Sequence, residues 1–519
     1  MSNSKPLAGY KVIDFSAVYA GPICARFLAD CGAEVIKIEP LGIGDITRGV
    51  DGLTPVFAHF NAGKRSVAVD LKSARGQNLV RQLVAQADIL VQNFRPGVME
   101  KFGLDYDSLK QEQPGLVFCS ISGFGLKGPW VNRAAFAPIV HAASGFDSVF
   151  ARAQNGPDKR PPNWEIMVAD ILTGAYAFGA IQTALLARER SGQGEHIDVS
   201  MMDAMMTLIP AQLQKAQTDR PLPIGRFHPV KTRDGFVMVT PISNKNFESL
   251  CALIERPDLL DDPRFVFGPR TRHFRELAIE IEKWSCKLES SQCVELLNNA
   301  GVPCSAYVEP DELFEHPQVV ARESFSRMHD DKLGDFLIQN MPMKFASFQN
   351  NTADWVAKLG EHTEEVMSSA LGLSNAELQE LREQKEFGEY HVTKEEIIEF
   401  ASKYDPQPFH LSEEAGKAMI FGGLCASGWH TCAMTMRMVV DQMPEGSGSL
   451  GSPGIDELRW LKPVFPGDTL RVRSTIASKK ESRSRPDMGS MVMKNEVLNQ
   501  KDEVVLQFNP IVMYKRRPT

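Results

Sequence analysis

Short apolar runs alternate with helical patterns through the N-terminal part of the chain. Lys11–Phe15 predicts a buried strand, Ile23–Cys31 a helix, and the alternating segment Glu34–Glu39 a second strand. Further strands are predicted at Val67–Leu71, Ile89–Val91 and Leu116–Ser120, separated by helical patterns such as Ala74–Ala87. Strands that alternate with helices build a parallel sheet, so this part is predicted to be α/β, doubly wound and Rossmann-like.

A different pattern starts near Tyr390. A helix is predicted at Lys394–Tyr404 and an apolar helix at Trp429–Val440. Three alternating segments then predict strands at Thr469–Ile476, Met491–Leu498 and Val504–Met513. A long helix followed by antiparallel strands predicts an α+β hot-dog fold. We therefore expect two domains, residues 1–387 and 388–519.

The composition is that of a folded protein, with 519 residues of which 43% are hydrophobic and 24% charged. A net charge of −8 and a pI near 5.9 argue against nucleic acid or an anionic membrane as the main partner. The basic run 515–517 is short, and a solvated tail is the favoured interpretation. No leader pattern or long uninterrupted apolar stretch is evident, so a cytoplasmic protein is expected. The nine cysteines lack metal-ligand spacing, which predicts reduced thiols and no metal site.

Asp170 opens a nearly all-apolar helical stretch that runs to Arg188 and contains Gly174 and Gly179. A carboxylate at a helix N-terminus is stabilised in its charged form, which keeps it available as a nucleophile. The same position also suits a helix-capping aspartate, and spacing alone favours that structural role. No GxGxxG loop is present, so the usual argument for a nicotinamide dinucleotide is missing, whereas a nucleotide of the CoA type remains open.

Several blocks, in the same order, resemble the class III CoA-transferases of the CaiB/BaiF family. They are PLAGYKVIDFSAVYAGP (6–22), AEVIKIEP (33–40), NAGKRSVAVDLK (61–72), VQNFRPG (91–97), SISGFGLKGP (120–129), VADILTGAYA (168–177), GQGEHIDVSMMDAM (192–205) and LGEHTEEV (359–366). In that family the aspartate matching Asp170 attacks the donor thioester and forms an acyl-aspartyl anhydride. The incoming acid replaces the first acyl group, and CoA recaptures the new one through an aspartyl thioester.

The resemblance also implies a binding site for coenzyme A. The positions that line CoA in relatives are occupied here by Tyr19, Ala20, Leu71, Asn93, Phe94 and Lys101. Lys64 and Arg65 are additional candidates for phosphate contacts, because a polyanionic carrier needs local cations; a solvated surface role is equally consistent with each. CoA thioesters are expected as substrates, with no permanently bound cofactor, and family membership implies a homodimer of interlinked chains.

Two departures from the family pattern bear on the substrate. Tyr19 stands where the formate- and oxalate-specific members carry glutamine, and their glycine-rich loop has no counterpart in segment 224–235. Formate and oxalate are therefore not the expected substrates. Arg226 and His228 in that segment are candidates for binding a second carboxylate, and a surface-loop role fits them equally well.

The C-terminal part resembles the MaoC-like (R)-specific enoyl-CoA hydratases, through VTKEEIIEFASKYDPQPFH (392–410), FGGLCASGWH (421–430) and LRWLKPVFPGDTL (458–470). In those enzymes the residues matching Asp405 and His410 hold a water, and the amide matching Gly428 stabilises the enolate oxygen. We expect Asp405 and His410 on a rigid, extended turn, because two prolines separate them. Gln407 replaces the usual asparagine and Ser427 the more common histidine, and the assisting serine further along the helix is missing.

The joint hypothesis is a bifunctional enzyme that moves CoA onto a carboxylic acid and hydrates or dehydrates the resulting acyl-CoA. Mesaconyl-CoA or itaconyl-CoA, esters of short unsaturated dicarboxylates, would use both reactions. One alternative is a CoA-transferase whose hot-dog domain is a non-catalytic module for acyl-CoA binding or dimerisation. Another is an active hydratase on a CoA-binding scaffold.

Overall fold

The N-terminal core is a six-stranded parallel sheet in the order β3-β2-β1-β4-β5-β6. The computed structural model describes residues 5–50, 52–154, 161, 165–218, 227–443, 448–482, 485 and 487–516. The strands are β1 (Lys11–Asp14), β2 (Glu34–Glu39), β3 (Arg65–Ala68), β4 (Ile89–Gln92), β5 (Val117–Ser122) and β6 (Glu195–Ser200). This order is that of a doubly wound Rossmann-like sheet, which confirms the predicted fold class.

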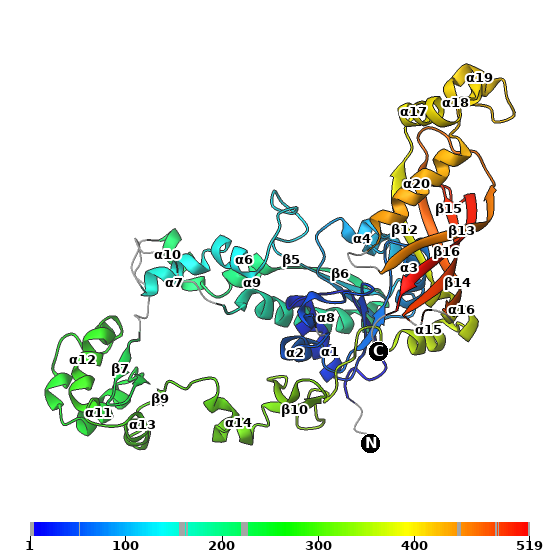
Figure 1. Ribbon diagram of the computed structural model, residues 1–519. Helices are drawn as coiled ribbons and strands as arrows, with labels where there is room; N and C mark the ends of the chain where they lie inside the picture. Colours follow the sequence, from blue (N-terminus) through cyan, green and yellow to red (C-terminus); the bar gives the residue numbers. More distant parts are fainter. Residues whose placement is uncertain are drawn as a thin grey trace.

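Helices cover both faces of this sheet (Figure 1). On one face, α1 (Ala20–Asp30) and α8 (Val168–Ser191) pack against each other and share one apolar core with Val12, Val35 and Val117. On the other face, α3 (Ala74–Val84) and α15 (Thr363–Leu371) pack over Ile13, Ile36 and Val67. Because side chains alternate along a strand, neighbouring residues of β1, β2 and β3 serve opposite layers.

The N-terminal part contains further elements outside this core sheet. They are α2 (Pro55–Asn61), α4 (Val98–Lys101), α5 (Tyr106–Leu109), α6 (Ala137–Ala143), α7 (Phe146–Gln154), α9 (Met201–Met206), α10 (Pro210–Gln217), α14 (Pro317–Ala321), α16 (Asn375–Glu383), the hairpin β10 (Phe325–Asp330) with β11 (Gly334–Gln339), and 3-10 turns at Ile46–Arg48 and Glu312–Phe314. Two more 3-10 turns, Pro257–Leu260 and Pro269–Arg272, pack on helices of the small lobe described next.

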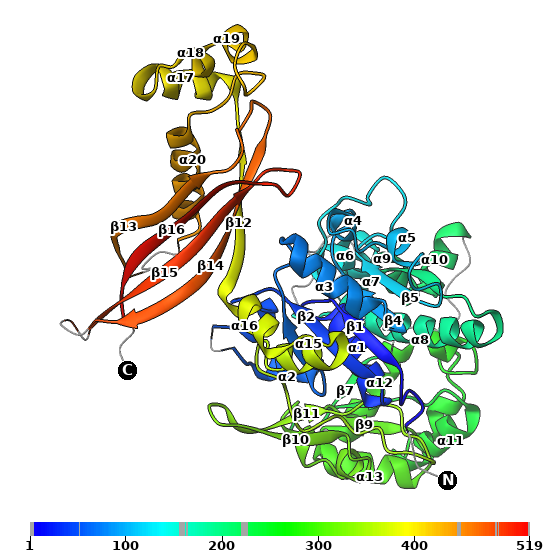
Figure 2. The same ribbon diagram turned by 90° about the vertical axis from the view of Figure 1, so that its right-hand side faces the viewer.

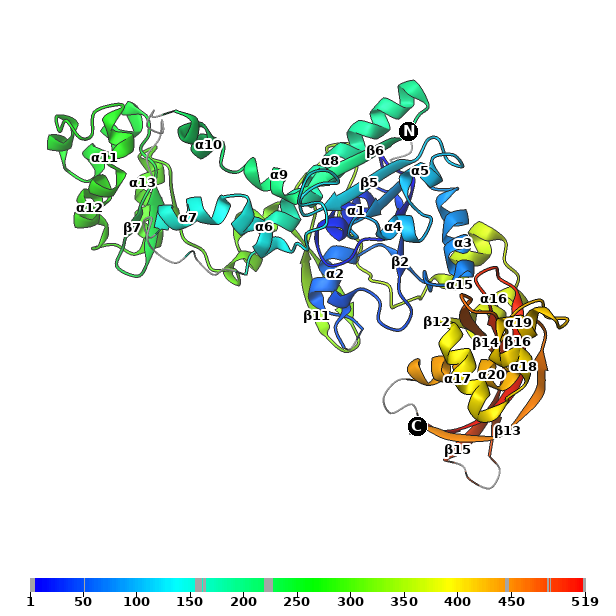
Figure 3. The ribbon, with the colours of Figure 1, turned by 90° about the horizontal axis from the view of Figure 1, so that it is seen from above.

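A small lobe with its own apolar core is inserted between α10 and α14. It contains β7 (Pro229–Lys231), β8 (Phe236–Val239), β9 (Cys304–Ala306), α11 (Asn244–Leu253), α12 (Phe274–Ser285) and α13 (Ser290–Asn299). Two separate connections join it to the parallel-sheet core, one through α10 and one through α14 (Figure 1). The lobe and the C-terminal domain lie at opposite ends of the molecule (Figure 3).

The C-terminal domain is an antiparallel sheet in the order β12-β14-β15-β16-β13, with α20 lying along it (Figure 2). Its strands are β12 (Gln384–His391), β13 (Ser449–Trp460), β14 (Thr469–Glu481), β15 (Met488–Leu498) and β16 (Val504–Lys515). Its helices are α17 (Lys394–Tyr404), α18 (Pro408–Leu411), α19 (Glu413–Lys417) and α20 (Gly428–Asp441). This arrangement confirms the predicted hot-dog fold. The predicted division at 387/388 falls inside β12.

Candidate active sites

The first candidate site lies at the carboxyl ends of β1 and β4, where the strand order changes direction. Asn93 follows β4, and its side chain holds the turn after β1: Oδ1 accepts from the Ala17 amide at 2.9 Å and Nδ2 donates to the Ala17 carbonyl at 2.8 Å. Open α/β sheets bind ligands in the crevice at this switch point. Tyr19 and Ala20, at the start of α1, are therefore placed where a ligand is expected. The Tyr19 ring meets Phe60 edge-on, with 4.9 Å between centroids.

Asp170 is brought to this turn by the packing of α8 on α1. An added Cβ at Gly174 would lie 2.6 Å from the Ala20 carbonyl oxygen, so only glycine allows this approach. The Ala20 amide faces the Asp170 carboxylate and acts to lower its pKa. Ala20 and Asp170, two predicted site residues that are far apart in the sequence, thus lie in one site.

The electrostatics of Asp170 differ from the sequence-based expectation. Burial raises the pKa of Asp170 to about 6, although the amides of Ala20 and of Asp170 itself act to lower it. Desolvation therefore outweighs the helix N-terminus that was expected to favour the charged form. Asp170 is also not the N-cap, because α8 begins at Val168 and Met167 occupies that position.

His141 is a member of this site that the sequence did not indicate. It lies on α6, it is buried, and its Nε2 accepts a hydrogen bond from the Ala169 amide at 3.1 Å. Met167 provides no side-chain cap, so His141 takes that role for the turn that carries Asp170. No local motif marks a histidine that caps a helix 28 residues later in the sequence.

Three predicted CoA-lining residues, Leu71, Phe94 and Lys101, lie apart from the turn that carries Tyr19 and Ala20, on the side of the sheet covered by α3. Leu71 and Phe94 are half-buried against the core under α3. Lys101 is exposed at the end of α4 and lines a surface groove with a volume of 380 Å³, together with Gln77 and Arg81. Lys101 gives this groove a positive charge that suits a phosphate-bearing ligand, whereas Arg81 is paired with Glu112 at 2.7 Å.

Lys64 and Arg65 do not fit the predicted role as phosphate ligands. Lys64 is 2% exposed, and its ammonium donates to Asp14 at 2.8 Å, to the Pro22 carbonyl and to Asn61. All three of its protons are used inside the protein. Arg65 pairs with two glutamates and lies on the sheet face covered by α3 and α15, opposite to α1. We therefore correct both assignments.

Of the two basic residues considered for a second carboxylate, Arg226 lies outside the described residues. His228 is half-buried and precedes β7 in the small lobe.

The second candidate site is formed in the C-terminal domain by Asp405, His410 and Ser427. Asp405 follows the last residue of α17, and its Oδ2 lies 3.6 Å from His410 Nε2. His410 Nδ1 lies 2.7 Å from the Cys425 carbonyl oxygen. A carbonyl can only accept, so Nδ1 carries the proton and Nε2 is the basic nitrogen that faces Asp405.

The segment between Asp405 and His410 is not the extended turn that its prolines predicted. Pro408 is the first residue of α18, so His410 is presented on a short helix and not on an extended turn. Proline suits this first position because its missing amide proton would have no partner there.

Two of the three departures from the hydratase pattern, Ser427 and Gln407, contact Asp405. Ser427 Oγ donates to Oδ2 at 2.7 Å, and Gln407 Nε2 donates to Oδ1 at 2.9 Å. These hydrogen bonds, that of Ser427 first, lower the pKa of Asp405 and keep it ionised. Gly428 begins α20, where first-turn amides lack partners within the helix. The Trp460 ring packs 2.6 Å from the position of a Cβ at Gly428, which excludes larger residues.

Comparisons with known proteins relate the two parts of the chain to two families. A sequence model of CoA-transferase family III matches residues 7–363, and a model of the MaoC like domain matches residues 377–499. The succinyl-CoA–D-citramalate CoA-transferase of Chloroflexus aurantiacus is 32% identical over 392 residues, 72% of this chain and 96% of that protein. The succinate–glutarate CoA-transferase of Agrobacterium fabrum is 36% identical over 344 residues, 62% and 85% of the two chains. The crystal structure of a CAIB/BAIF family protein from Brucella suis superimposes with a TM-score of 0.61 at 30% identity, and covers 71% of this chain and all (100%) of its own.

Proposed function

Given that the chain belongs to CoA-transferase family III, we propose that it transfers coenzyme A between carboxylic acids with Asp170 as the nucleophile. The observation that carries this proposal is the half-buried Asp170 carboxylate, which the close approach of α8 to α1 at Gly174 and Ala20 brings to the sheet switch point. A carboxylate with a pKa near 6 is mostly ionised at neutral pH, yet it is poorly solvated and therefore reactive.

The chemistry follows from these groups. The carboxylate attacks the thioester carbonyl, the carbon–sulfur bond breaks, and CoA leaves as a thiolate while the acyl group forms an anhydride with Asp170. The CoA thiolate then attacks the aspartyl carbonyl of this anhydride, which releases the donor acid and leaves a thioester between Asp170 and CoA. The acceptor carboxylate attacks that thioester, forms a second anhydride and expels the thiolate. The thiolate finally takes the acceptor acyl group, which releases the new CoA ester and frees the Asp170 carboxylate. Each step conserves one activated acyl bond, so the reaction needs no ATP. The Ala20 amide is placed to stabilise negative charge that develops on an oxygen of this centre.

We infer a short dicarboxylate as the acyl group. The relatives from Chloroflexus and Agrobacterium are named for succinyl-CoA, D-citramalate, succinate and glutarate. Tyr19, in place of the glutamine of formate- and oxalate-specific members, supports a substrate larger than those two acids. Mesaconyl-CoA and itaconyl-CoA remain the preferred candidates, because each carries a double bond for a second reaction.

For the C-terminal domain we propose hydration of an enoyl-CoA or dehydration of a 3-hydroxyacyl-CoA. The 3.6 Å between His410 Nε2 and Asp405 Oδ2 leaves both groups able to contact one water. The Gly428 amide at the start of α20 is placed to stabilise an enolate oxygen. The competing proposal is a non-catalytic acyl-CoA-binding or dimerisation module.

Mass spectrometry of CoA esters tests both activities together. The purified protein is incubated with succinyl-CoA and a panel of C4–C6 acids in heavy-oxygen water. A new ester that also gains labelled water supports two reactions, and a new ester without label supports the non-catalytic module. Asp170→Asn should abolish transfer alone and Asp405→Asn hydration alone. Transfer that survives in Asp170→Asn would refute the proposed nucleophile.

We also propose a homodimer. The chain exposes 29246 Å², whereas a compact monomer of its mass would expose about 19,000 Å². Helix α8 contributes to the excess: Ile171, Tyr176 and Leu186 are exposed on it. Among the described residues α8 is also long and apolar enough to cross a membrane, and only 33% of its most apolar stretch is buried. A second chain that covers this surface explains these observations, and sedimentation should give twice the mass of 57.6 kDa.

A further inference from the structure

The turn that carries Tyr19 and Ala20 contains a backbone conformation that its sequence disfavours. Val18 has a φ of 71°, in the left-handed region. A β-branched side chain rarely adopts this region, because its Cβ substituents crowd the backbone. Such a conformation persists only where the surroundings impose it, and it is typical of functional sites.

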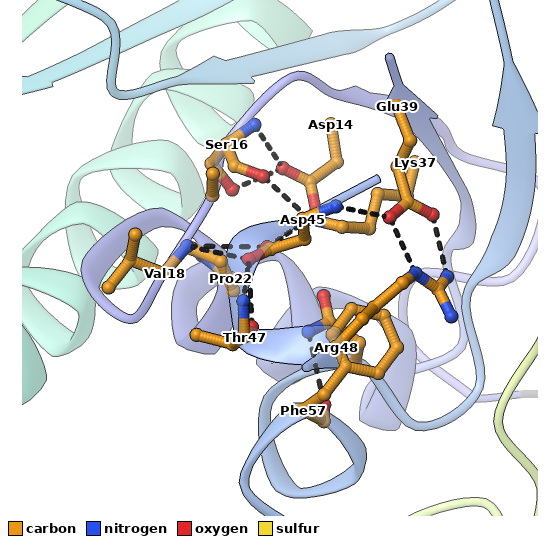
Figure 4. Close-up of polar contacts among 12 residues, drawn as sticks. Asp14, Ser16, Val18, Pro22, Lys37, Glu39, Asp45, Thr47, Arg48 and Phe57 are labelled. Atoms are coloured by element: carbon orange, nitrogen blue, oxygen red, sulfur yellow. Dashed lines mark hydrogen bonds and ion pairs between the residues drawn. The ribbon is translucent and has the colours of Figure 1, made fainter. Parts of the chain in front are cut away.

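The restraint on Val18 comes from Asp45. Both carboxylate oxygens of Asp45 accept from the Val18 amide, at 3.3 and 3.2 Å (Figure 4). Asp45 is in turn held by Thr47, whose amide and hydroxyl donate to Oδ1 at 3.0 and 2.7 Å, and by Lys37, whose ammonium lies 3.1 Å from Oδ2. Lys37 also donates to the Ser16 carbonyl at 2.6 Å. One ion pair thus holds the turn on both sides of Ala17.

A second ion pair, between Arg48 and Glu39, holds the backbone of Asp45 in place. Arg48 binds Glu39 through two hydrogen bonds of 2.8 and 2.7 Å, and Glu39 also accepts the Asp45 amide at 3.0 Å. Burial raises the pKa of Asp45, but Lys37 and the Thr47 hydrogen bonds outweigh it and leave that pKa lowered, so Asp45 is charged. Buried ion pairs of this kind add little net stability over apolar packing. Their position around one strained turn indicates a geometric role.

We propose that Asp45, held by Lys37, is a positioning residue that keeps Val18 left-handed and thereby aims the Ala20 amide at the Asp170 carboxylate. Val18 and Ala20 are two residues apart, so a change in the φ of Val18 rotates the peptide units that follow it. This inference rests on the proposed role of Asp170 as the nucleophile. Asp45 does not touch the reacting atoms and acts only through the turn.

The test is the pH profile of CoA transfer by Asp45→Asn. If the Ala20 amide turns away, it no longer lowers the pKa of Asp170, so the acid limb of kcat/KM should shift upward from about pH 6. At pH 7.5, kcat/KM should fall about 10- to 100-fold. His141 also faces the first turn of α8, so the limb is assigned by comparison with His141→Gln, which keeps an acceptor for the Ala169 amide but does not titrate. The sharper test is rescue: glycine adopts a positive φ freely, so Val18→Gly should return the limb of Asp45→Asn toward the wild-type position.

Asp30→Asn is the matched control. Asp30 is also buried and also paired, with Arg26 Nε at 3.1 Å, but it lies at the other end of α1. It should cost stability without moving the acid limb. If Asp45→Asn does not fold, the isosteric Thr47→Val, which removes one donor to Asp45, should shift the limb in the same direction by less.

Two results would overturn the inference: an unmoved limb in folded Asp45→Asn or in Thr47→Val, or a limb that moves equally in Asp30→Asn. Failure of the proposed function appears separately, as transfer that survives in Asp170→Asn.

Discussion

The close approach of α8 to α1 makes Gly174 a sensitive position of the transferase site. In Gly174→Ala the new Cβ would lie 2.2 Å from Ile23 Cγ2 and 2.6 Å from the Ala20 carbonyl oxygen. The Ile23 side chain can rotate, but the carbonyl belongs to the backbone. Ordinary contact begins at 3.4 Å, so α8 must retreat by about 0.8 Å at this point.

The magnitude follows from two opposing effects. Alanine is about 1 kcal/mol more favourable than glycine inside a helix. Overpacking of a close contact costs about 1–3 kcal/mol. Gly174→Ala should therefore lower the free energy of unfolding by roughly 0–2 kcal/mol. Asp170 lies one helical turn before Gly174, so the same retreat separates its carboxylate from the Ala20 amide, and kcat/KM for CoA transfer should fall about 10- to 100-fold.

Gly179→Ala is the matched control on the same helix. A Cβ at Gly179 meets nothing within 4 Å in its own chain, so this variant should leave the contact of α8 with α1 intact and retain transfer activity. Urea denaturation and a steady-state assay of CoA-ester exchange measure both variants. The reasoning is refuted if Gly174→Ala keeps its transfer activity within about twofold and matches Gly179→Ala in stability.

Three further outcomes are expected. Lys64→Met should lower the free energy of unfolding by about 3–5 kcal/mol in denaturant titrations, because it leaves Asp14 buried without its counter-ion. The KM for CoA esters should stay unchanged. A raised KM with normal stability would restore Lys64 as a ligand. Transfer should decline as the pH falls through about 6, when Asp170 takes up a proton; a transfer profile that stays level below pH 6 would contradict this. Ser427→Ala removes a donor to Asp405, so the acid limb of hydration should move to higher pH, and an unmoved limb would show that Ser427 does not set the charge of Asp405.

Local sequence patterns predicted the elements whose hydrophobic period is strong. Glu34–Glu39 and Lys394–Tyr404 are a strand and a helix with the predicted bounds. The alternation of Thr469–Ile476 located β14, although the strand continues to Glu481. Edge strands β6 and β13 were not predicted, because an edge strand is stabilised by one neighbour and can remain largely exposed, so its apolar alternation is weak.

The site was predictable where chemistry is read from a motif, and not where it depends on distant packing. The resemblance blocks singled out Asp170, Asp405 and His410 as candidates, and the fold places the last two with 3.6 Å between His410 Nε2 and Asp405 Oδ2. The role of Lys64 was not, since only the fold shows that its ammonium meets Asp14 from another strand. Asp45 was missed as well, although Asp45-Ile46-Thr47 is a typical Asx-turn sequence.

The two candidate catalytic aspartates show how one chain prepares the same side chain for different tasks. Asp170 is desolvated against α1, and two backbone amides only partly compensate, so its pKa rises to about 6. Asp405 accepts from Ser427 and Gln407, and its pKa falls below the ordinary value. A nucleophile benefits from poor solvation, because less solvent must be displaced when it attacks, whereas a carboxylate that orients a water beside His410 benefits from staying ionised. This divergence of two carboxylates is a physical reason, independent of sequence similarity, to assign them to different reactions.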